Sequence, residues 1–257
     1  MVKPEKKSTS WDKVGGWYHK TVGKSGMHYH QTIVLPNVLR LLDLQKNPES
    51  SLLDLGCGQG VLSRVIPKNI PYTGVDISPT LVDIAKKEKL SKVHDFFVGD
   101  VTKKIPVVKT DYSHAAIILA IQNMEHPDRT IANIAQHLAK GAVLVIVMNH
   151  PCFRIPRQSS WGIDDKQKVQ FRRIDSYMSS REIPILAEPG KGELSPVTLS
   201  FHHPLSYYFT KLSGAGFAVD LLEEWCSDKT STGGKAKQEN RARDEFPLFL
   251  ALRAVKL

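Results

Sequence analysis

The sequence predicts an α/β fold in which helices cover a doubly wound, mostly parallel sheet. Between residues 51 and 148, short apolar segments alternate with amphipathic ones, and such alternation requires right-handed crossovers between parallel strands. The first apolar segment, 51–55, runs directly into the turn Gly56-Cys57-Gly58-Gln59-Gly60. A strand, a glycine loop and a helix in this order are typical of a nucleotide site at the carboxyl edge of a sheet.

The segment before the first strand is predicted to be an N-terminal arm. Residues 1–10 are expected to be a disordered tail, because they are rich in lysine, serine and threonine and show no hydrophobic period. Residues 11–47 follow as a lid with helices, and apolar residues recur at helical spacing over 32–44. The aromatic and glycine residues of this segment suit a lid that closes over a ligand, and they equally suit an arm that covers the core.

Residues 48–150 are predicted to form the core of the sheet. One strand ends in a carboxylate at Asp76, and Ser78 followed by Pro79 is a strong start signal for the next helix. The other elements follow from apolar patterns and turn signals. Strands are expected over 51–55, 72–76, 95–98, 113–120 and 142–148, and helices over 61–66 (ended by Pro67), from Pro79, and from Ile131 to Leu138 with Gly141 as the cap at its end.

Residues 204–257 are predicted to complete the core. A helix is expected over 204–214. Strands are expected over 216–222 and 247–252, and they bring the number of strands in the sheet to seven. The stretch 227–245 between these two strands is polar and is expected to be mobile.

Residues 151–203 interrupt the alternation after the fifth strand. They follow the carboxyl end of that strand, and open α/β folds bind their substrates at this edge. We therefore predict that this insertion is a substrate cap.

Composition argues against several classes of protein. The net charge of +9 is spread along the chain rather than gathered in one run, which argues against nucleic acid as the partner. No apolar stretch is long enough to span a membrane, and the polar N-terminus is unlike a signal peptide. Cys57, Cys152 and Cys226 lack metal-ligand spacing. We expect a reduced, cytoplasmic protein without a metal site, and the oligomeric state stays open.

Three residues around the glycine loop indicate which nucleotide it binds. A dinucleotide fingerprint would place its third glycine where Val61 stands, which disfavours a nicotinamide dehydrogenase. Asp54, two places before Gly56, could accept a hydrogen bond from a ligand ammonium, and this suits an amino-acid moiety better than a pyrophosphate. Asp76 lies 20 residues after Gly56 (76 − 56), at the tip of the second strand, where a carboxylate reaches a ribose diol.

The D-x-G-x-G-x-G form of residues 54–60 resembles motif I of the class I S-adenosylmethionine-dependent methyltransferases. Asp76, Asp100 and the segment after the fourth strand follow in the order of that family, so the resemblance spans about residues 51–150. It implies a Rossmann-like fold of the small-molecule type, whose sheet closes with an antiparallel last strand. It also implies S-adenosyl-L-methionine as cofactor and S-adenosyl-L-homocysteine as product. The residues expected at the cofactor are Asp54, Gly56, Cys57, Gly58, Gln59, Gly60, Asp76, Ile77, Ser78, Gly99, Asp100, Val101, Leu119, Ala120 and Ile121.

The function that follows is methyl transfer by in-line displacement to an O or N atom of a small molecule. Because the sulfonium donor is already activated, the protein mainly supplies alignment, and a base is needed only where the acceptor must lose a proton. Candidate bases are His150, His30 and Tyr29, each of which could equally serve packing or hydrogen bonding. Contacts to the acceptor are expected from Trp17, Tyr18, Gln122, Asn123, Asn149, Phe153 and Trp161.

Two other functions stay open. The first is a methyltransferase acting on RNA or protein, although residues 120–123 lack the Asn/Asp-Pro-Pro-aromatic run that some amino-methylating nucleic-acid enzymes carry after the fourth strand. The second is a non-catalytic protein that binds the cofactor and uses its lid aromatics for a partner.

Overall fold

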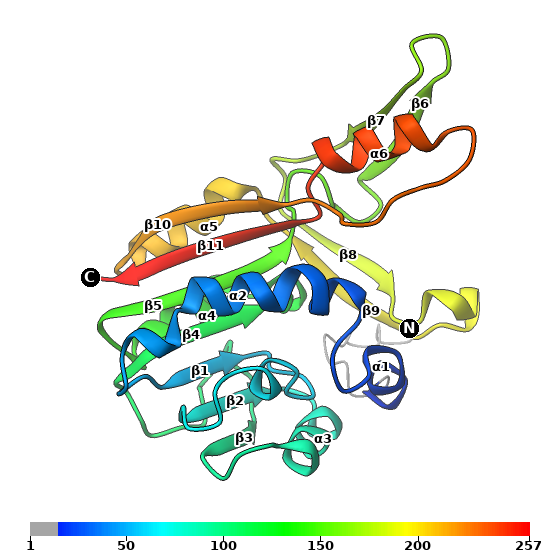
Figure 1. Cartoon of the computed structure of the whole chain (residues 1–257). Helices are drawn as coiled ribbons and strands as arrows, with labels where there is room; N and C mark the ends of the chain where they lie inside the picture. The colour runs from blue at the N-terminus through cyan, green and yellow to red at the C-terminus, as the bar shows by residue number, and fades with distance from the viewer. Residues whose placement is uncertain (1–14) are drawn as a thin grey trace, which may run out of the picture.

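The computed structural model describes residues 15–257, so the tail predicted over 1–10 and the first four residues of the predicted lid lie outside the described part. Its centre is a seven-stranded sheet in the order β10-β11-β5-β4-β1-β2-β3 (Figure 1). All neighbouring pairs are parallel except those that β11 makes with β5 and β10. This confirms the predicted Rossmann-like sheet with a reversed last strand. The strands are β1 (Leu52–Leu55), β2 (Tyr72–Asp76), β3 (His94–Val98), β4 (Tyr112–Ile118), β5 (Leu138–Asn149), β10 (Phe217–Trp225) and β11 (Phe249–Lys256).

Helices cover both faces of the sheet, which explains why its central strands are apolar throughout. On one face, Ile131 and Ile134 of α4 (Pro127–Ala135) and Leu212 of α5 (Leu205–Gly214) pack on the sheet. On the other, residues of α2 (Leu35–Leu42) and α3 (Pro79–Glu88) form a second cluster. All four residues of β1 are buried, as expected for a strand covered on both faces.

The helix starts follow their local signals. Ser78 caps α3 by accepting a hydrogen bond from the Leu81 N–H at 3.3 Å, and Pro79 is its first residue. The helix predicted over 32–44 begins with a π-helical turn, η2 (His30–Val34), and continues as α2. The remaining helices are α1 (Gly15–Val22) and α6 (Ala236–Glu245), with the short 3-10 turns η3 (Leu44–Lys46), η4 (Leu62–Arg64), η5 (Ile121–Asn123) and η6 (Pro189–Leu194).

Two local predictions were wrong. The helix expected over 61–66 is only the turn η4, because Gly60 enters it at φ +78° and the chain leaves for β2 soon after. Gly141 does not end α4, which stops at Ala135. It lies inside β5 at φ +79°, where the pairing of β4 with β5 shifts register. The stretch 227–245 contains helix α6, and its mobility stays a prediction.

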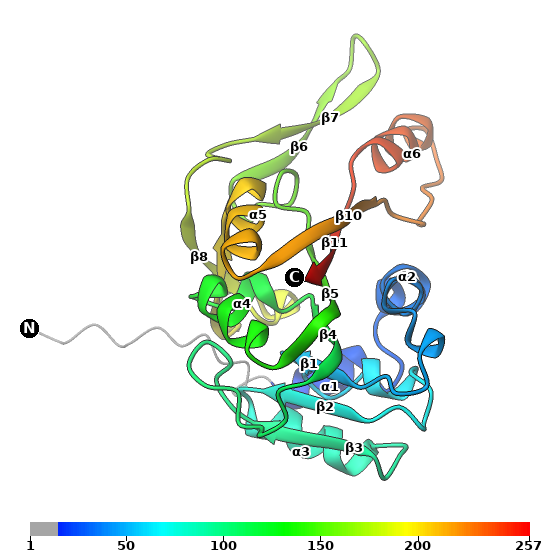
Figure 2. The same ribbon diagram turned by 90° about the vertical axis from the view of Figure 1, so that its left-hand side faces the viewer.

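The inserted segment after β5 forms two antiparallel hairpins. The first joins β6 (Ser159–Asp164) to β7 (Val169–Ile174), and the second joins β8 (Arg181–Leu186) to β9 (Val197–His202). The β6–β7 hairpin projects beyond the main sheet, and α6 packs beside it (Figures 1 and 2). Among residues 15–257, no helix is both long and apolar enough to cross a membrane.

Candidate cofactor and acceptor site

The glycine loop after β1 lies against the end of β4. Gly56 has φ +74°, and a Cβ added to it would stand 2.5 Å from the Cβ of Ala120. Only glycine satisfies both the backbone angle and this close approach. The loop and the segment after β4 are therefore brought together at the carboxyl edge of the sheet.

The Asp76 carboxylate is fixed by the backbone on both sides. Its Oδ2 accepts the Gly58 N–H at 2.9 Å, and its Oδ1 accepts the Ser78 N–H at 2.9 Å. Burial raises the pKa of Asp76, and these backbone hydrogen bonds oppose the rise. A carboxylate only accepts hydrogen bonds, and this is what the two hydroxyl groups of a ribose require. The neighbouring side chain of Ile77 is 40% exposed, so an apolar surface stands open beside the carboxylate.

Asp54 lies beneath the loop rather than at its surface. Its carboxylate is buried, and the Tyr72 hydroxyl donates a hydrogen bond of 2.6 Å to its Oδ2. Burial raises the pKa of Asp54 to about 7, with the Tyr72 hydrogen bond opposing and the charge of Asp76 adding to the rise. No sequence pattern indicated this partner, because Tyr72 stands at the opposite end of β2 from Asp76.

The N-terminal arm is attached to the glycine loop by Gln59. This side chain is 1% exposed, its Oε1 accepts a hydrogen bond of 2.6 Å from His19 Nδ1, and its Nε2 donates one of 2.6 Å to the Gly23 carbonyl. Arg64 adds a hydrogen bond of 2.9 Å to the Lys24 carbonyl. Three side-chain contacts thus hold α1 and the turn after it over the loop.

Two predicted acceptor contacts lie on this arm. Burial raises the pKa of Tyr18 to about 12, and the charge of Asp76 adds to the effect. Trp17, on the same helix, is half-buried.

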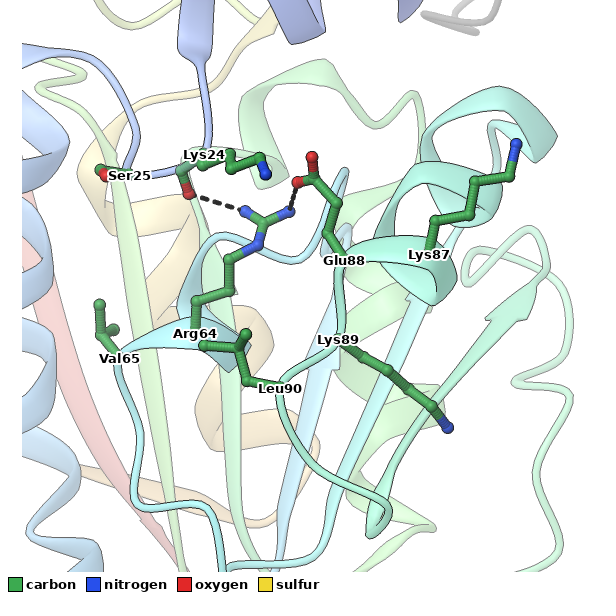
Figure 3. A pocket seen from close by; sticks show the side chains of 8 residues that line it. All are labelled: Lys24, Ser25, Arg64, Val65, Lys87, Glu88, Lys89 and Leu90. Carbon is green, nitrogen blue, oxygen red and sulfur yellow. Dashed lines mark hydrogen bonds and ion pairs between the residues drawn. The ribbon is translucent and has the colours of Figure 1, made fainter.

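A cavity of about 510 Å³ lies between the turn after α1, η4 and the end of α3 (Figure 3). Arg64 stands at its centre and bonds the Lys24 carbonyl and the Glu88 carboxylate, the latter at 2.7 Å. Lys87 and Lys89 point away from this centre (Figure 3). None of the predicted site residues lines this cavity.

The segment after β3 holds its own turn together. Asp100 Oδ1 accepts hydrogen bonds from the Thr102 N–H at 3.0 Å and the Thr102 hydroxyl at 2.6 Å. Burial by itself raises the pKa of Asp100, but these bonds and Lys103 outweigh it and lower the pKa. The Gly99 N–H donates to the Asp76 carbonyl at 2.9 Å, and Val101 is buried in the core.

The end of β4 has an unusual backbone. Leu119 has φ +53°, and its carbonyl accepts a hydrogen bond of 2.9 Å from Gln122 Nε2. Gln122 Oε1 is buried and has no hydrogen-bond partner within residues 15–257. Ile121, predicted at the cofactor, is fully buried in the core, so its side chain cannot contact a ligand. Cys57 is likewise buried, with its thiol directed at the Gly58 carbonyl.

A small cavity of about 20 Å³ lies at the ends of β4 and β5. Gln122 and Asn149, two predicted acceptor contacts, line it together with Arg154, Ser200 and His202. Asn123 lies on the same 3-10 turn, η5, as Gln122. The second hairpin of the insertion therefore faces the strand ends where an acceptor was expected.

The other two predicted acceptor contacts pack against the C-terminal helix region. The ring centres of Phe153 and Phe246 are 5.6 Å apart, and those of Trp161 and Phe246 are 5.5 Å apart. We call these three residues the cap cluster. It joins the insertion to the segment between β10 and β11.

The three candidate bases differ in their surroundings. The Cys152 N–H donates to His150 Nδ1 at 3.2 Å, so Nε2 carries the proton and donates to Glu224 Oε1 at 2.6 Å. Both ring nitrogens of the buried His150 are therefore engaged. The Tyr29 hydroxyl shares a hydrogen bond of 2.9 Å with Ser227.

His30 is half-buried, and its ring makes no hydrogen bond within the described chain. A Cβ added to Gly26 would stand 2.6 Å from His30 Cβ and 3.3 Å from Val61 Cγ1, so His30 lies close to the glycine loop. Burial lowers the pKa of His30 and keeps the ring neutral, the form that accepts a proton.

Fold and site together define an α/β protein that binds a nucleoside cofactor at the strand ends. A family model described as a methyltransferase domain matches residues 27–184. The chain belongs to this family of methyltransferase domains, whose members are S-adenosylmethionine-dependent and Rossmann-like, so S-adenosylmethionine is its cofactor. The glycine loop and the Asp76 carboxylate fit this group.

Individual relatives are distant. The chain is 27% identical over 165 residues to the ubiquinone biosynthesis O-methyltransferase of Coxiella burnetii, covering 62% of this chain and 70% of that protein. It is 33% identical over 104 residues to the mouse (Mus musculus) 18S rRNA (guanine-N(7))-methyltransferase, covering 40% of this chain and 36% of that protein. An S-adenosylmethionine-dependent methyltransferase structure from Mesorhizobium loti superposes with a TM-score of 0.68 at 20% identity, covering 91% of this chain and 100% of that one.

Proposed function

We propose that this methyltransferase moves the methyl group to an O or N atom of a small molecule. When bound, the cofactor supplies a methyl group on a sulfonium, which needs no further activation. Alignment is then the main contribution of the chain, worth up to about 7–11 kcal/mol in favourable cases. The observation that carries the proposal is the group of polar side chains at the ends of β4 and β5, where Gln122 lies one strand and Asn149 two strands from the glycine loop.

Specific residues have specific roles in this proposal. Asp76 holds the ribose hydroxyls, and the glycine loop receives the amino-acid moiety. The buried, unpartnered Gln122 Oε1 is available to accept a hydrogen bond from the acceptor. His30 is the base where the acceptor must lose a proton, because His150 has no free ring nitrogen.

RNA is the second candidate for the methyl acceptor, supported by the rRNA-methylating relative and by the net charge of +9. Ion pairs argue against it, since Arg40, Arg64, Arg173 and Arg253 are each bound to a carboxylate. Arginines committed in this way contribute little to a phosphate-binding surface.

One experiment separates the acceptor classes. The chain is incubated with S-adenosylmethionine labelled on the methyl group and with a cell extract divided into small molecules, RNA and protein. The proposal expects label in the small-molecule fraction, and none with Asp76→Ala. Label in RNA, lost steeply as salt rises, would favour the second candidate.

A further inference from the structure

Two arginines of the inserted segment share one aromatic ring. The guanidinium carbon of Arg172, on β7, lies 5.0 Å from the centre of the Trp161 ring, and that of Arg154 lies 5.4 Å from it. Arginine packs well on an aromatic face. Trp161 is 37% exposed, so solvent and solutes reach this arrangement.

Neither of these arginines has a carboxylate partner in the described part of the chain. Arg172 donates to the Phe153 carbonyl at 2.8 Å and to the Ser159 hydroxyl at 2.7 Å. Arg154 makes two long contacts of 3.4 Å to backbone carbonyls at residues 246 and 247. Their neighbour Arg173, in contrast, pairs with Asp175 at 3.1 Å.

The two positive charges therefore stand near each other without compensation. Burial, and then the charge of Arg172, lower the pKa of Arg154 to about 10, and burial lowers the pKa of Arg172. Both effects disfavour the charged guanidinium, and a bound anion would reverse them. Planar guanidinium groups bind carboxylate and phosphate oxygens in pairs.

Arg154 also belongs to the acceptor site. It lines the small cavity at the strand ends together with Gln122 and Asn149. The guanidinium of the same residue packs on Trp161, so Arg154 connects the strand ends to the cap cluster.

We propose that the methyl acceptor is an acid, and that its carboxylate or phosphate monoester binds between Arg154 and Arg172 beside Trp161. This inference rests on the proposed function, because it names the class of acceptor for the same site. The acid group anchors the acceptor on the cap, while the atom that receives the methyl lies toward the ends of β4 and β5.

The test uses the full chain saturated with S-adenosylhomocysteine. Benzoate and phenyl phosphate serve as charged probes, and benzamide serves as the neutral probe of similar size, all at one ionic strength. The indole N–H resonance of Trp161, one of four tryptophans, is assigned with Trp161→Phe and followed by NMR. We expect a saturable shift with at least one charged probe, at an affinity at least tenfold higher than that of benzamide.

Variants identify the groups responsible. Arg172→Gln and Arg154→Gln should each weaken binding of the charged probe at least tenfold. Arg173→Gln, which removes the same charge from the next residue on β7, should change it less than twofold. If Arg172→Gln does not fold, Arg172→Lys and Arg154→Gln carry the test.

Equal binding of benzamide and the charged probes, no shift with either charged probe, or equal losses in Arg172→Gln and Arg173→Gln would overturn the proposal. S-adenosylhomocysteine binding is measured separately on every variant and should stay unchanged. Absence of that binding in the wild-type chain would instead count against the proposed function, and the Trp161 titration without cofactor would still report on the anion site.

Discussion

The Tyr72 hydroxyl donates a hydrogen bond of 2.6 Å to the buried carboxylate of Asp54, directly beneath the glycine loop. A buried carboxylate without a donor is costly, and a hydrogen bond to a charged group contributes about 1.5–3 kcal/mol. Tyr72→Phe should therefore lower the free energy of unfolding by about this amount at pH 8. Tyr112→Phe, which removes a hydroxyl bound to the neutral Thr73 at 2.8 Å, is the control, and its expected loss is about 0.5–1.5 kcal/mol. Urea unfolding measures both, and equal losses would contradict this account.

The same pair predicts a pH dependence. Burial raises the folded pKa of Asp54 to about 7, above its unfolded value, so the folded chain binds more protons between these two values. This contribution to stability is present below the unfolded pKa, about 4, and is lost as pH rises toward about 7. In Tyr72→Phe the pKa of Asp54 should be higher, because the hydrogen bond that lowers it is absent. The loss of stability with rising pH should therefore continue above pH 7. Urea unfolding at a series of pH values tests this, and identical pH profiles for the two proteins would count against it.

The arm should open when Gln59 is shortened. Gln59→Ala removes two hydrogen bonds, from His19 and to Gly23, and each contributes about 1 kcal/mol. Amide hydrogen exchange in α1 should become about tenfold faster or more, while exchange in α4 stays the same. Gln136→Ala, an exposed change at the end of α4, should leave α1 unaffected. Unchanged exchange in α1 of Gln59→Ala would show that other contacts hold the arm.

Two glycines of the loop should respond differently to alanine. Gly58→Ala meets no atom within 4 Å and carries only the cost of φ +54°, about 1–2 kcal/mol. Gly56→Ala adds a clash with Ala120 at 2.5 Å, and overpacking costs typically about 1–3 kcal/mol more. The expected order of unfolding free energy is wild type, Gly58→Ala, Gly56→Ala. The reverse order of the two variants would mean that the loop is not pressed against the segment after β4.

Alanine variants of His30 and His150 should differ in their single-turnover rates. If the acceptor loses a proton, His30→Ala should lower the rate of a single turnover by about 10²–10⁴. Because burial lowers the pKa of His30, the wild-type rate should fall only below pH about 6.5. His150→Ala should chiefly lower stability, since it breaks the bond to Glu224. A rate loss confined to His150→Ala would assign the base to His150 instead.

The sequence was most informative where structure is decided locally. The strand, the glycine loop and Asp76 follow from short-range spacing, and so does the Ser78 cap of α3. The turn η4 and the bulge at Gly141 were missed. Gly60 and Gly141 both adopt positive φ, and a glycine in a sequence does not reveal whether it ends a helix, forms a turn or makes a bulge.

Long-range contacts of the site could not be predicted. Gln59 and His19 are separated by 40 residues, and Trp161 meets Phe246 across the insertion and the end of α6. Trp161 and Arg172 lie opposite each other in the register of the β6–β7 hairpin, and Arg154 reaches the same ring from the segment before β6. In the sequence these two arginines look like any others in a segment of mixed charge.

The most direct test of the central claim is calorimetric titration with S-adenosylhomocysteine, with NADH as the control ligand. We expect micromolar binding of the first, none of the second, and loss of binding in Asp76→Ala. The exposed Asp95→Ala, on the neighbouring strand β3, should bind normally, and urea unfolding should show that both variants are folded. Undiminished affinity in a folded Asp76→Ala, or equal binding of NADH, would contradict the proposed site.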